Sequence, residues 1–339
     1  MKRKRSLSLL MALALMLSFL SGCGQKTPTV AAPKKVKIAF CFQDLNTEFW
    51  VAGHKSITET LKAKGIEVIE RNANQDANKQ LEQVKDAIAQ KVDAIIIIPQ
   101  DGDSAVTIAE TCNQAGVPLA VFNRPPSSKD AKQFVVVANN EKISEDAAAF
   151  MALQAKKLGR KVTPCIMVGD LGDPNAVLRR KGFMTVIEKN PDLFNKVIEV
   201  PTKWDANVAQ ANLQSALQAN PNIDFLFTSS DFMYPQIKAV LEPLGKWKPS
   251  GDPKHVILGG VDGDSTAGKL MDNKYVDATG VQDLNFEAKA VMDAMLKAIA
   301  NKDKTPNEWS QDPGFALTLD NMPQRKMDMW GNQIRTDLK

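Results

Sequence analysis

A short apolar stretch that ends in an amide and a guanidinium stands out near the middle of the 339-residue chain. Residues 117–122 are apolar, and Asn123, Arg124 and Pro125 follow them. Because Gly116 precedes the run and a proline closes it, an interior parallel strand fits better than a helix. Ligands bind beyond the carboxyl ends of strands in open α/β sheets, where Asn123 and Arg124 offer directional donors for hydroxyl groups. Taken alone, a turn asparagine and a solvated arginine explain the pair equally well.

Other expected strands also end in polar or aromatic residues. Aromatic faces pack against the C–H face of a sugar ring, while amides and carboxylates bond its hydroxyls. Each such residue is more often a helix cap or a turn residue, and Phe49 is better explained as a core anchor. Together, at the carboxyl ends of two sets of strands, they predict a binding site. The candidates are Gln43, Thr47, Phe49, Trp50, Asn123, Arg124, Asn175, Arg179, Trp204, Ser230, Asp262 and Gln282.

One choice within this set stays open. Asn175 and Arg179 are four residues apart, so they share one face of an expected helix. Arg180 follows directly, and one of the two arginines is expected to point to solvent. The helical wheel alone does not decide which.

Alternating strands and helices position these ends. Strands are expected at 36–42, 65–70, 92–99, 117–125, 134–137, 162–168, 196–200, 223–228, 255–261, 275–281 and 315–319. Helices are expected at 46–64, 74–90, 103–115, 144–158, 175–189, 206–219, 233–244, 265–271 and 285–300. Asp101 or Asp103 could cap the third helix, and a polar tail follows residue 319. The isoleucine run 95–98 favours a strand buried on both faces, as in a parallel sheet covered by helices. The fold class is therefore α/β, with two Rossmann-like lobes that separate near residue 138.

The N-terminus has the layout of an export signal. Residues 2–5 are all basic, an apolar run of 9–20 follows, and Leu20-Ser21-Gly22-Cys23 closes it. The tetrapeptide resembles the lipobox of bacterial lipoproteins, which implies removal of residues 1–22 and lipidation of Cys23. Residues 23–35 then form a flexible tether. We expect an extracytoplasmic protein that is lipid-anchored to the cell membrane and faces the periplasm where an outer membrane is present.

Composition excludes several other functions. Without residues 1–22 the chain has 39 basic and 39 acidic residues and no basic patch with aromatics, so no nucleic-acid partner is expected. Cys41, Cys112 and Cys165 lie in apolar stretches and read as buried thiols. The two histidines have no ligand at metal spacing, and no glycine-rich nucleotide or hydrolase motif occurs. No metal, no cofactor and no enzymatic activity are expected.

A family resemblance becomes clear from these residues together. Asp44-Leu45 with Glu48 and Trp50, Asn123-Arg124, Asn175-Ala176 with Gly182, Trp204, Val261-Asp262-Gly263 and Gln282 occur in one order. Over residues 35–319 the chain resembles the type I periplasmic binding proteins of ABC importers, the ribose-, galactose- and xylose-binding group. The D-L-x-x-E-x-W piece leans toward the xylose-binding branch. Ser230, Gln43 and Thr47 depart from common family choices, which leaves the identity of the sugar open.

The resemblance implies a monomer of two lobes joined by three crossings near residues 138, 283 and 314. The N-terminal lobe would comprise 36–138 and 283–314, and the C-terminal lobe 139–282 and 315–339. A monosaccharide, a pentose or hexose, would be clamped between them. Asn123, Arg124, Arg179, Asp262 and Gln282 would hold its hydroxyls, and Trp50 and Trp204 would sandwich its ring. The partners implied are an ABC permease and its ATPase.

Three other functions compete with import. A sensor of the same fold would present the sugar to a chemoreceptor or sensor kinase. A sugar-responsive repressor shares the fold, but the export signal and the lack of DNA-binding helices argue against it. A secreted hydrolase or isomerase would need a carboxylate pair, for which Asp262 and Asp264 are the only candidates nearby.

Overall fold

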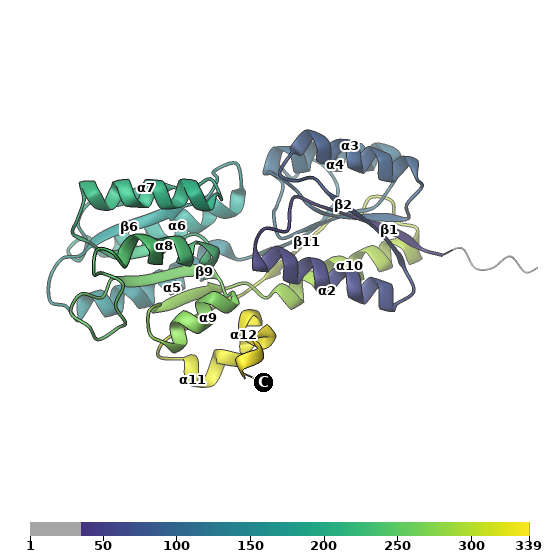
Figure 1. Cartoon of the computed structure of the whole chain (residues 1–339). Helices are drawn as coiled ribbons and strands as arrows, with labels where there is room; N and C mark the ends of the chain where they lie inside the picture. The colour runs from purple at the N-terminus through teal and green to yellow at the C-terminus, as the bar shows by residue number, and fades with distance from the viewer. Residues whose placement is uncertain (1–34, 339) are drawn as a thin grey trace, which may run out of the picture. The chain divides into compact units, whose positions relative to one another are not determined.

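Two six-stranded sheets form the framework of the chain in the computed structural model, which describes residues 35–338. Residues 36–338 belong to one unit that carries both sheets with their helices (Figure 1). The predicted signal segment, the lipidation at Cys23 and almost all of the tether lie outside the described residues. This α/β architecture with two parallel-rich sheets confirms the predicted fold class.

All neighbouring strands of the first sheet are parallel, in the order β11-β5-β4-β3-β1-β2. Its strands are β1 (Lys37–Phe42), β2 (Glu67–Asn72), β3 (Ala94–Ile98), β4 (Leu119–Phe122), β5 (Phe134–Ala138) and β11 (Glu308–Asp312). Helices α2 (Glu48–Ala63) and α10 (Leu284–Asn301) cover one face of the sheet, and α3 (Ala77–Ala89) and α4 (Gly102–Ala115) cover the other (Figure 1). Asp101, not Asp103, caps α4 by accepting from the amide of Ser104 at 2.7 Å.

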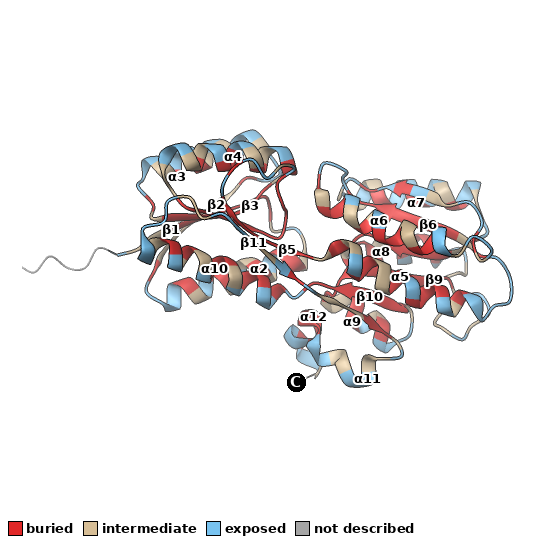
Figure 2. Ribbon diagram, turned by 180° about the vertical axis from the view of Figure 1, so that it is seen from behind, coloured by how far each residue is buried: buried red, intermediate tan, exposed pale blue. Residues whose placement is uncertain are grey.

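Strand β3 explains why both faces of this sheet need helices. Its side chains alternate between the two faces, as in any strand. Ile96 and Ile98 pack with the cluster formed under α2 and α10, and Ile95 and Ile97 pack with the cluster under α3 and α4. All four side chains are fully buried. The strand buried on both faces that the isoleucine run predicts is therefore confirmed (Figure 2).

The second sheet repeats this plan in the order β12-β10-β9-β8-β6-β7. Its strands are β6 (Thr163–Val168), β7 (Ile198–Pro201), β8 (Ile223–Thr228), β9 (Ile257–Asp262), β10 (Ala278–Val281) and β12 (Phe315–Thr318), of which only β12 pairs antiparallel. Helices α5 (Asn140–Lys156) and α6 (Pro174–Lys189) pack on one face. The other face carries α7 (Ala206–Ala219), α8 (Tyr234–Leu241) and α9 (Ser265–Asp272).

The sequence prediction is wrong for two segments near the C-terminus. Strand β11 was not predicted, because its residues are mostly polar and it pairs along one side only. The expected polar tail instead forms the short helices α11 (Met322–Arg325) and α12 (Trp330–Ile334). Met329 and Trp330 are buried there, but two apolar residues in a polar stretch give no periodicity that would reveal a helix.

The three cysteines of the described chain are buried, free thiols, which confirms their predicted role as small core residues. Burial raises the pKa of Cys41, Cys112 and Cys165 to about 12, so all three stay protonated at neutral pH. Among residues 35–338, no helix combines the length and the hydropathy needed to cross a bilayer.

Candidate functional site

A cavity of about 550 Å³ lies where the carboxyl ends of the two sheets face each other. All twelve residues selected from the sequence line it. The first sheet contributes residues that follow β1 and β4, and the second contributes residues at the ends of β6, β7, β8, β9 and β10. In each sheet the strand that comes first along the chain, β1 or β6, lies between the next two strands, β2 and β3 or β7 and β8. The strand order therefore reverses at β1 and at β6, and open α/β sheets bind ligands at such a switch point.

Five lining residues have a backbone conformation that favours glycine. They are Gln75, Asn123, Lys203, Trp204 and Asp262, with φ values of 64°, 65°, 54°, 55° and 128°. Asparagine tolerates the left-handed region, but such conformations cost other residues about 1 to 3 kcal/mol and persist only where the surroundings hold them. The site is therefore built by tertiary contacts and not by local preference.

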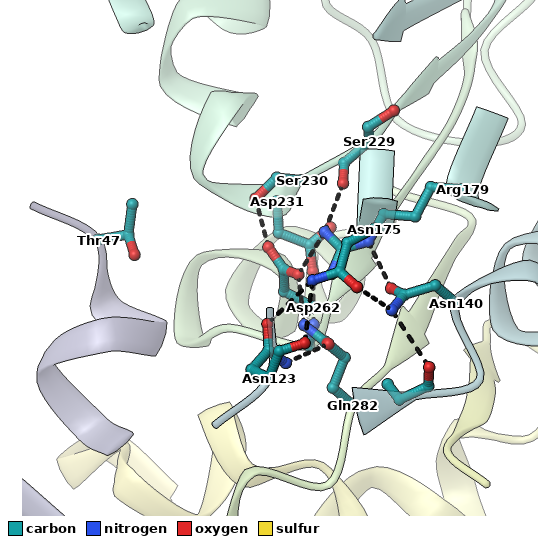
Figure 3. A network of polar contacts seen from close by, with 12 residues as sticks. Thr47, Asn123, Asn140, Asn175, Arg179, Ser229, Ser230, Asp231, Asp262 and Gln282 are labelled. Carbon is teal, nitrogen blue, oxygen red and sulfur yellow. Dashed lines mark hydrogen bonds and ion pairs between the residues drawn. The ribbon is translucent and has the colours of Figure 1, made fainter. Parts of the chain in front are cut away.

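Arg179 of α6 is the centre of the polar contacts on the floor of the cavity (Figure 3). Its Nη1 lies 2.9 Å from Oδ1 of Asp262 and donates to the carbonyl oxygen of Ser229 at 2.8 Å. Its Nε donates to Oδ1 of Asn140 at 2.6 Å. Asp262 also accepts from the Ser230 hydroxyl and, at 2.8 Å, from Nε2 of Gln282.

Three asparagines complete a closed path of hydrogen bonds. Asn140 Nδ2 donates to Oδ1 of Asn175 at 2.9 Å, and Asn175 Nδ2 donates to the carbonyl oxygen of Asn123 at 3.2 Å. Asn123 Nδ2 donates to Oε1 of Gln282 at 2.8 Å, which returns the path to Asp262. We call these six residues the polar ring: Asn123, Asn140, Asn175, Arg179, Asp262 and Gln282.

Arg124 forms a second buried polar group beside the ring. Its Nη1 donates to the carbonyl oxygens of Pro99 at 3.1 Å and Gln100 at 2.6 Å, and to Oε1 of Gln43. Its Nε lies 2.8 Å from Oδ2 of Asp173, and both side chains are only 5% exposed. The guanidinium is therefore fixed in orientation by four partners, two of them backbone carbonyls.

The two tryptophans lie next to these guanidinium groups. Arg124 Cζ is 5.6 Å from the ring centroid of Trp50, and Arg179 Cζ is 6.0 Å from that of Trp204. The Trp204 indole also donates to Oδ2 of Asp173 at 3.2 Å. Gly169 makes room for this ring, because a Cβ at that position would lie 2.2 Å from it.

Phe49 and Thr47 line the cavity but are largely engaged elsewhere. The Phe49 ring is buried against Trp50, Phe122 and Trp330, which confirms that it anchors the core. The Thr47 hydroxyl accepts from the amide of Trp50 at 3.4 Å and so caps α2. Figure 3 shows Thr47 apart from the polar ring, at the start of that helix.

The structure decides between the two arginines of α6. Arg180 donates to the Glu199 carboxylate at 2.8 Å, and both side chains are about 40% exposed. Arg179 is buried and faces the cavity. Only Arg179 can therefore contact a ligand there.

Three aspartates that are buried in or next to the polar ring have raised pKa values. Burial raises the pKa of Asp231 to about 7, and the neighbouring charge of Asp262 adds to the rise. Burial also raises the pKa of Asp262, against the opposing charge of Arg179. The pKa of Asp264 lies well above its ordinary value because of burial and the nearby Asp231. Asp264 caps α9 and does not line the cavity, so the two carboxylates considered for hydrolysis do not face it together.

The charges around the cavity suit a neutral ligand. Six aspartates and three cations are among the lining residues, and both arginines are paired with an aspartate. The third cation, Lys203, is exposed at the rim. A phosphate or carboxylate inside the cavity would therefore meet no unpaired buried cation. Within the described residues, no group of His, Cys, Asp or Glu is arranged to hold a metal ion.

Three buried residues of this site were missed by sequence reasoning. Asp173 reads as an ordinary cap before Pro174, and it does accept from the amide of Asn175 at 2.9 Å, while its second oxygen binds Arg124. Asn140 was placed before a helix that actually begins there. Glu287 accepts from Asn123 at 2.9 Å but lies in a helix far along the chain. Nothing in their local sequence distinguishes them from caps and helix-surface residues.

Comparison with known proteins shows the family of this chain. The family model described as a periplasmic binding protein domain matches residues 38–303. The chain belongs to this family. Among the relatives of this periplasmic binding protein is the ribose import binding protein of Bacillus subtilis, which is 29% identical over 86% of the chain and 92% of the relative. A xylitol-binding protein of Mycolicibacterium smegmatis is 28% identical over 89% of the chain and 82% of the relative.

Solved structures of periplasmic binding proteins share the fold. An ABC transporter solute binding protein from Bacillus halodurans with bound myo-inositol gives a TM-score of 0.74 at 26% identity. The match covers 86% of this chain and 98% of that structure. The names of these relatives describe binding proteins and not enzymes.

Proposed function

We propose that this periplasmic binding protein captures a neutral monosaccharide, a pentose or hexose or a related polyol, and delivers it to the permease of an ABC importer. The observation that carries the proposal is a single cavity of about 550 Å³ lined by five members of the polar ring, by the Arg124–Asp173 pair, and by Trp50 and Trp204. Relatives named for ribose import and xylitol binding support the same ligand class.

The arrangement supplies both kinds of contact that a sugar needs. In the proposal, the carboxylate of Asp262, the guanidinium of Arg179 and the amide of Gln282 exchange part of their mutual bonding for sugar hydroxyls. Leaving such a buried group unpaired costs about 1 to 3 kcal/mol, so a ligand without matching hydroxyls is rejected. Trp50 and Trp204 would pack against the C–H faces of the ring, because large aromatic faces bury apolar surface there.

Closure of two lobes would couple binding to transport. We assign residues 36–138 with 283–314 to one lobe and 139–282 with 315–339 to the other. Residues that follow the first sheet bond directly to residues that follow the second. The carbonyl oxygen of Asn123 accepts from Nδ2 of Asn175, and the Glu48 carboxylate accepts from the amide and the hydroxyl of Ser265, both at 2.7 Å. A sugar that adds contacts to both lobes shifts a hinge equilibrium by the free energy of those contacts. The permease would then distinguish loaded from empty protein.

The proposed location is the outer face of the cell membrane. The family is periplasmic, and the basic segment, apolar run and Cys23 of the N-terminus support a lipid anchor. A tether of residues 23–35 would leave the binding protein free to reach its permease.

Isothermal titration calorimetry tests the function. The panel is D-ribose, D-xylose, D-allose, xylitol and myo-inositol, with D-ribose 5-phosphate and D-glucuronate as anionic comparisons. We expect at least one neutral member to bind with micromolar affinity or better and both anions to bind at least about 100-fold more weakly, a difference of about 2.7 kcal/mol. Failure of every neutral member to bind would reject the proposal.

A further inference from the structure

The C-terminal segment Met329–Asn332 packs backbone to backbone against the loop between β9 and α9. The amide of Gly331 donates to the carbonyl oxygen of Gly263 at 3.1 Å. A Cβ on Gly331 would lie 2.2 Å from the carbonyl carbon of Asp264, and a Cβ on Gly268 would lie 2.1 Å from Oδ1 of Asn332. The Gly331 contact is with backbone atoms, so that position requires glycine, and the two segments fit each other closely there.

This packing brings Trp330 onto the main chain of Asp262. The indole Nε1 donates to the carbonyl oxygen of Asp262 at 2.8 Å, and the side chain is only 2% exposed. The other donor to that oxygen, the amide of Gln282, is 3.3 Å away. The indole is therefore the closer of the two donors.

Asp262 is the member of the polar ring that most needs such support. Its φ of 128° is rarely adopted by a residue with a side chain. Its carboxylate meets Ser230, Gln282 and Arg179 only because the backbone holds this conformation. On the following residue, the amide of Gly263 donates to Asp231 at 2.7 Å, so the peptide is held from both sides.

Trp330 also contacts α2, the helix that carries Phe49. Its ring centroid is 5.7 Å from that of Phe49 in α2, with the planes at 79°. The same tryptophan thus contacts a residue from each side of the cavity: the Asp262 main chain and the Phe49 ring. The family model ends at residue 303, so this contact lies outside the part of the chain that the model matches.

We propose that Trp330 is a positioning residue of the binding site: its indole N–H fixes the main chain of Asp262, and its ring links that residue to Phe49. The C-terminal segment is thereby a working part of the site and not a tail. The effect on affinity rests on the proposed sugar-binding function, but the effect on the Asp262 loop does not.

The first test needs no ligand. Trp330→Phe keeps an aromatic ring and removes the N–H donor, and Trp247→Phe makes the same change at a ring that stacks on Tyr275 at 5.0 Å, away from the cavity. Hydrogen exchange followed by mass spectrometry should show amides of residues 262–265 exchanging about tenfold faster in Trp330→Phe and unchanged in Trp247→Phe. Circular dichroism checks that both variants fold. Unchanged exchange in Trp330→Phe would overturn the inference.

The second test is calorimetry with D-ribose, D-xylose and myo-inositol. For each sugar that binds the wild-type protein, we expect about a tenfold loss of affinity in Trp330→Phe and less than a twofold loss in Trp247→Phe. In an Asp262→Asn background, Trp330→Phe should cause little further loss, because the carboxylate it positions is gone. Fully additive losses would contradict the positioning role. If no sugar binds the wild-type protein, the proposed function fails while the exchange experiment still decides the role of Trp330.

Discussion

Nε of Arg124, which follows strand β4 of the first sheet, lies 2.8 Å from Oδ2 of Asp173, which begins helix α6 beside the second sheet. Both side chains are 5% exposed, so the pair is buried at the point where the two sheets face each other. Removing one partner of such a pair is costly, because the other charge stays buried without compensation. Loss of either charge should therefore weaken the contact between the two halves of the chain.

Replacement of Asp173 by asparagine should weaken sugar binding. The amide oxygen can still cap α6 through the amide of Asn175, but the charge opposite Arg124 is lost. We expect calorimetry to show a 10- to 100-fold loss of affinity, or about 1.4 to 2.7 kcal/mol. Glu199→Gln, which breaks the exposed pair with Arg180, is the matched control and should change affinity by less than twofold. Equal effects of the two changes would refute the role of the buried pair.

Replacement by lysine should change the sugar affinity very differently at the two adjacent arginines of α6. Arg179→Lys loses the fork that reaches Asn140, Ser229 and Asp262 together, so affinity should fall by 100-fold or more. Arg180→Lys changes only an exposed pair, and its affinity should stay within twofold of wild type. Calorimetry on both variants measures this, and a strong effect at Arg180 would show that the helix faces the ligand differently.

A methyl group at Gly169 should displace Trp204. The added Cβ would lie 2.2 Å from the indole ring, so Gly169→Ala should lower affinity by about tenfold and shift the tryptophan fluorescence. Gly172→Ala adds the same methyl three residues later, where the nearest atom is 3.2 Å away at the end of the Asp170 side chain. Its affinity should stay within about threefold of wild type. Normal binding by Gly169→Ala would argue against a ligand contact at Trp204.

Stability should depend on pH through Asp231. Burial raises its pKa to about 7, above the ordinary value of 3.8, so the folded protein binds the proton more tightly than the unfolded chain does. Its contribution to stability is then fully present below about pH 4 and is lost as the pH rises to about 7. Asp262, Asp264 and Tyr234 are titratable groups that interact with Asp231. Only the difference between wild type and a variant therefore isolates the contribution of Asp231.

Asp231→Asn supplies that difference. The amide oxygen can still accept from the Gly263 amide and the Thr279 hydroxyl, both at 2.7 Å. The melting temperature of wild type relative to the variant should fall between pH 4.5 and pH 7 and level off above it. A difference that does not vary with pH in scanning calorimetry would contradict the raised pKa.

The proposed lipid anchor gives a prediction outside the described residues. In a bacterial host that processes lipoproteins, the wild-type chain should incorporate labelled palmitate and fractionate with membranes. Cys23→Ala should lose the label and be released, because a single change removes the thiol that carries the lipid. Membrane association that persists without Cys23 would require another anchor.

The sequence predicts the strand ends well for a simple physical reason. Parallel strands place their carboxyl ends at one edge, so residues such as Asn123, Trp204 and Asp262 gather once the alternation of strands and helices is recognised. Asp173 could not be found in this way, because a capping aspartate that also pairs with Arg124 looks like any other cap until the two halves pack together. Asn140 was missed because its helix was expected to begin only near residue 144. Trp330 could not be found at all from a stretch without periodicity.

A crystal structure of the protein grown separately with D-ribose, D-xylose and myo-inositol tests the central claim most directly. We predict a sugar or polyol ring between Trp50 and Trp204, with hydroxyls bonded to Arg179 and Asp262 of the polar ring. An empty cavity with each of these at saturating concentration, or a sugar bound on another surface, would contradict the account.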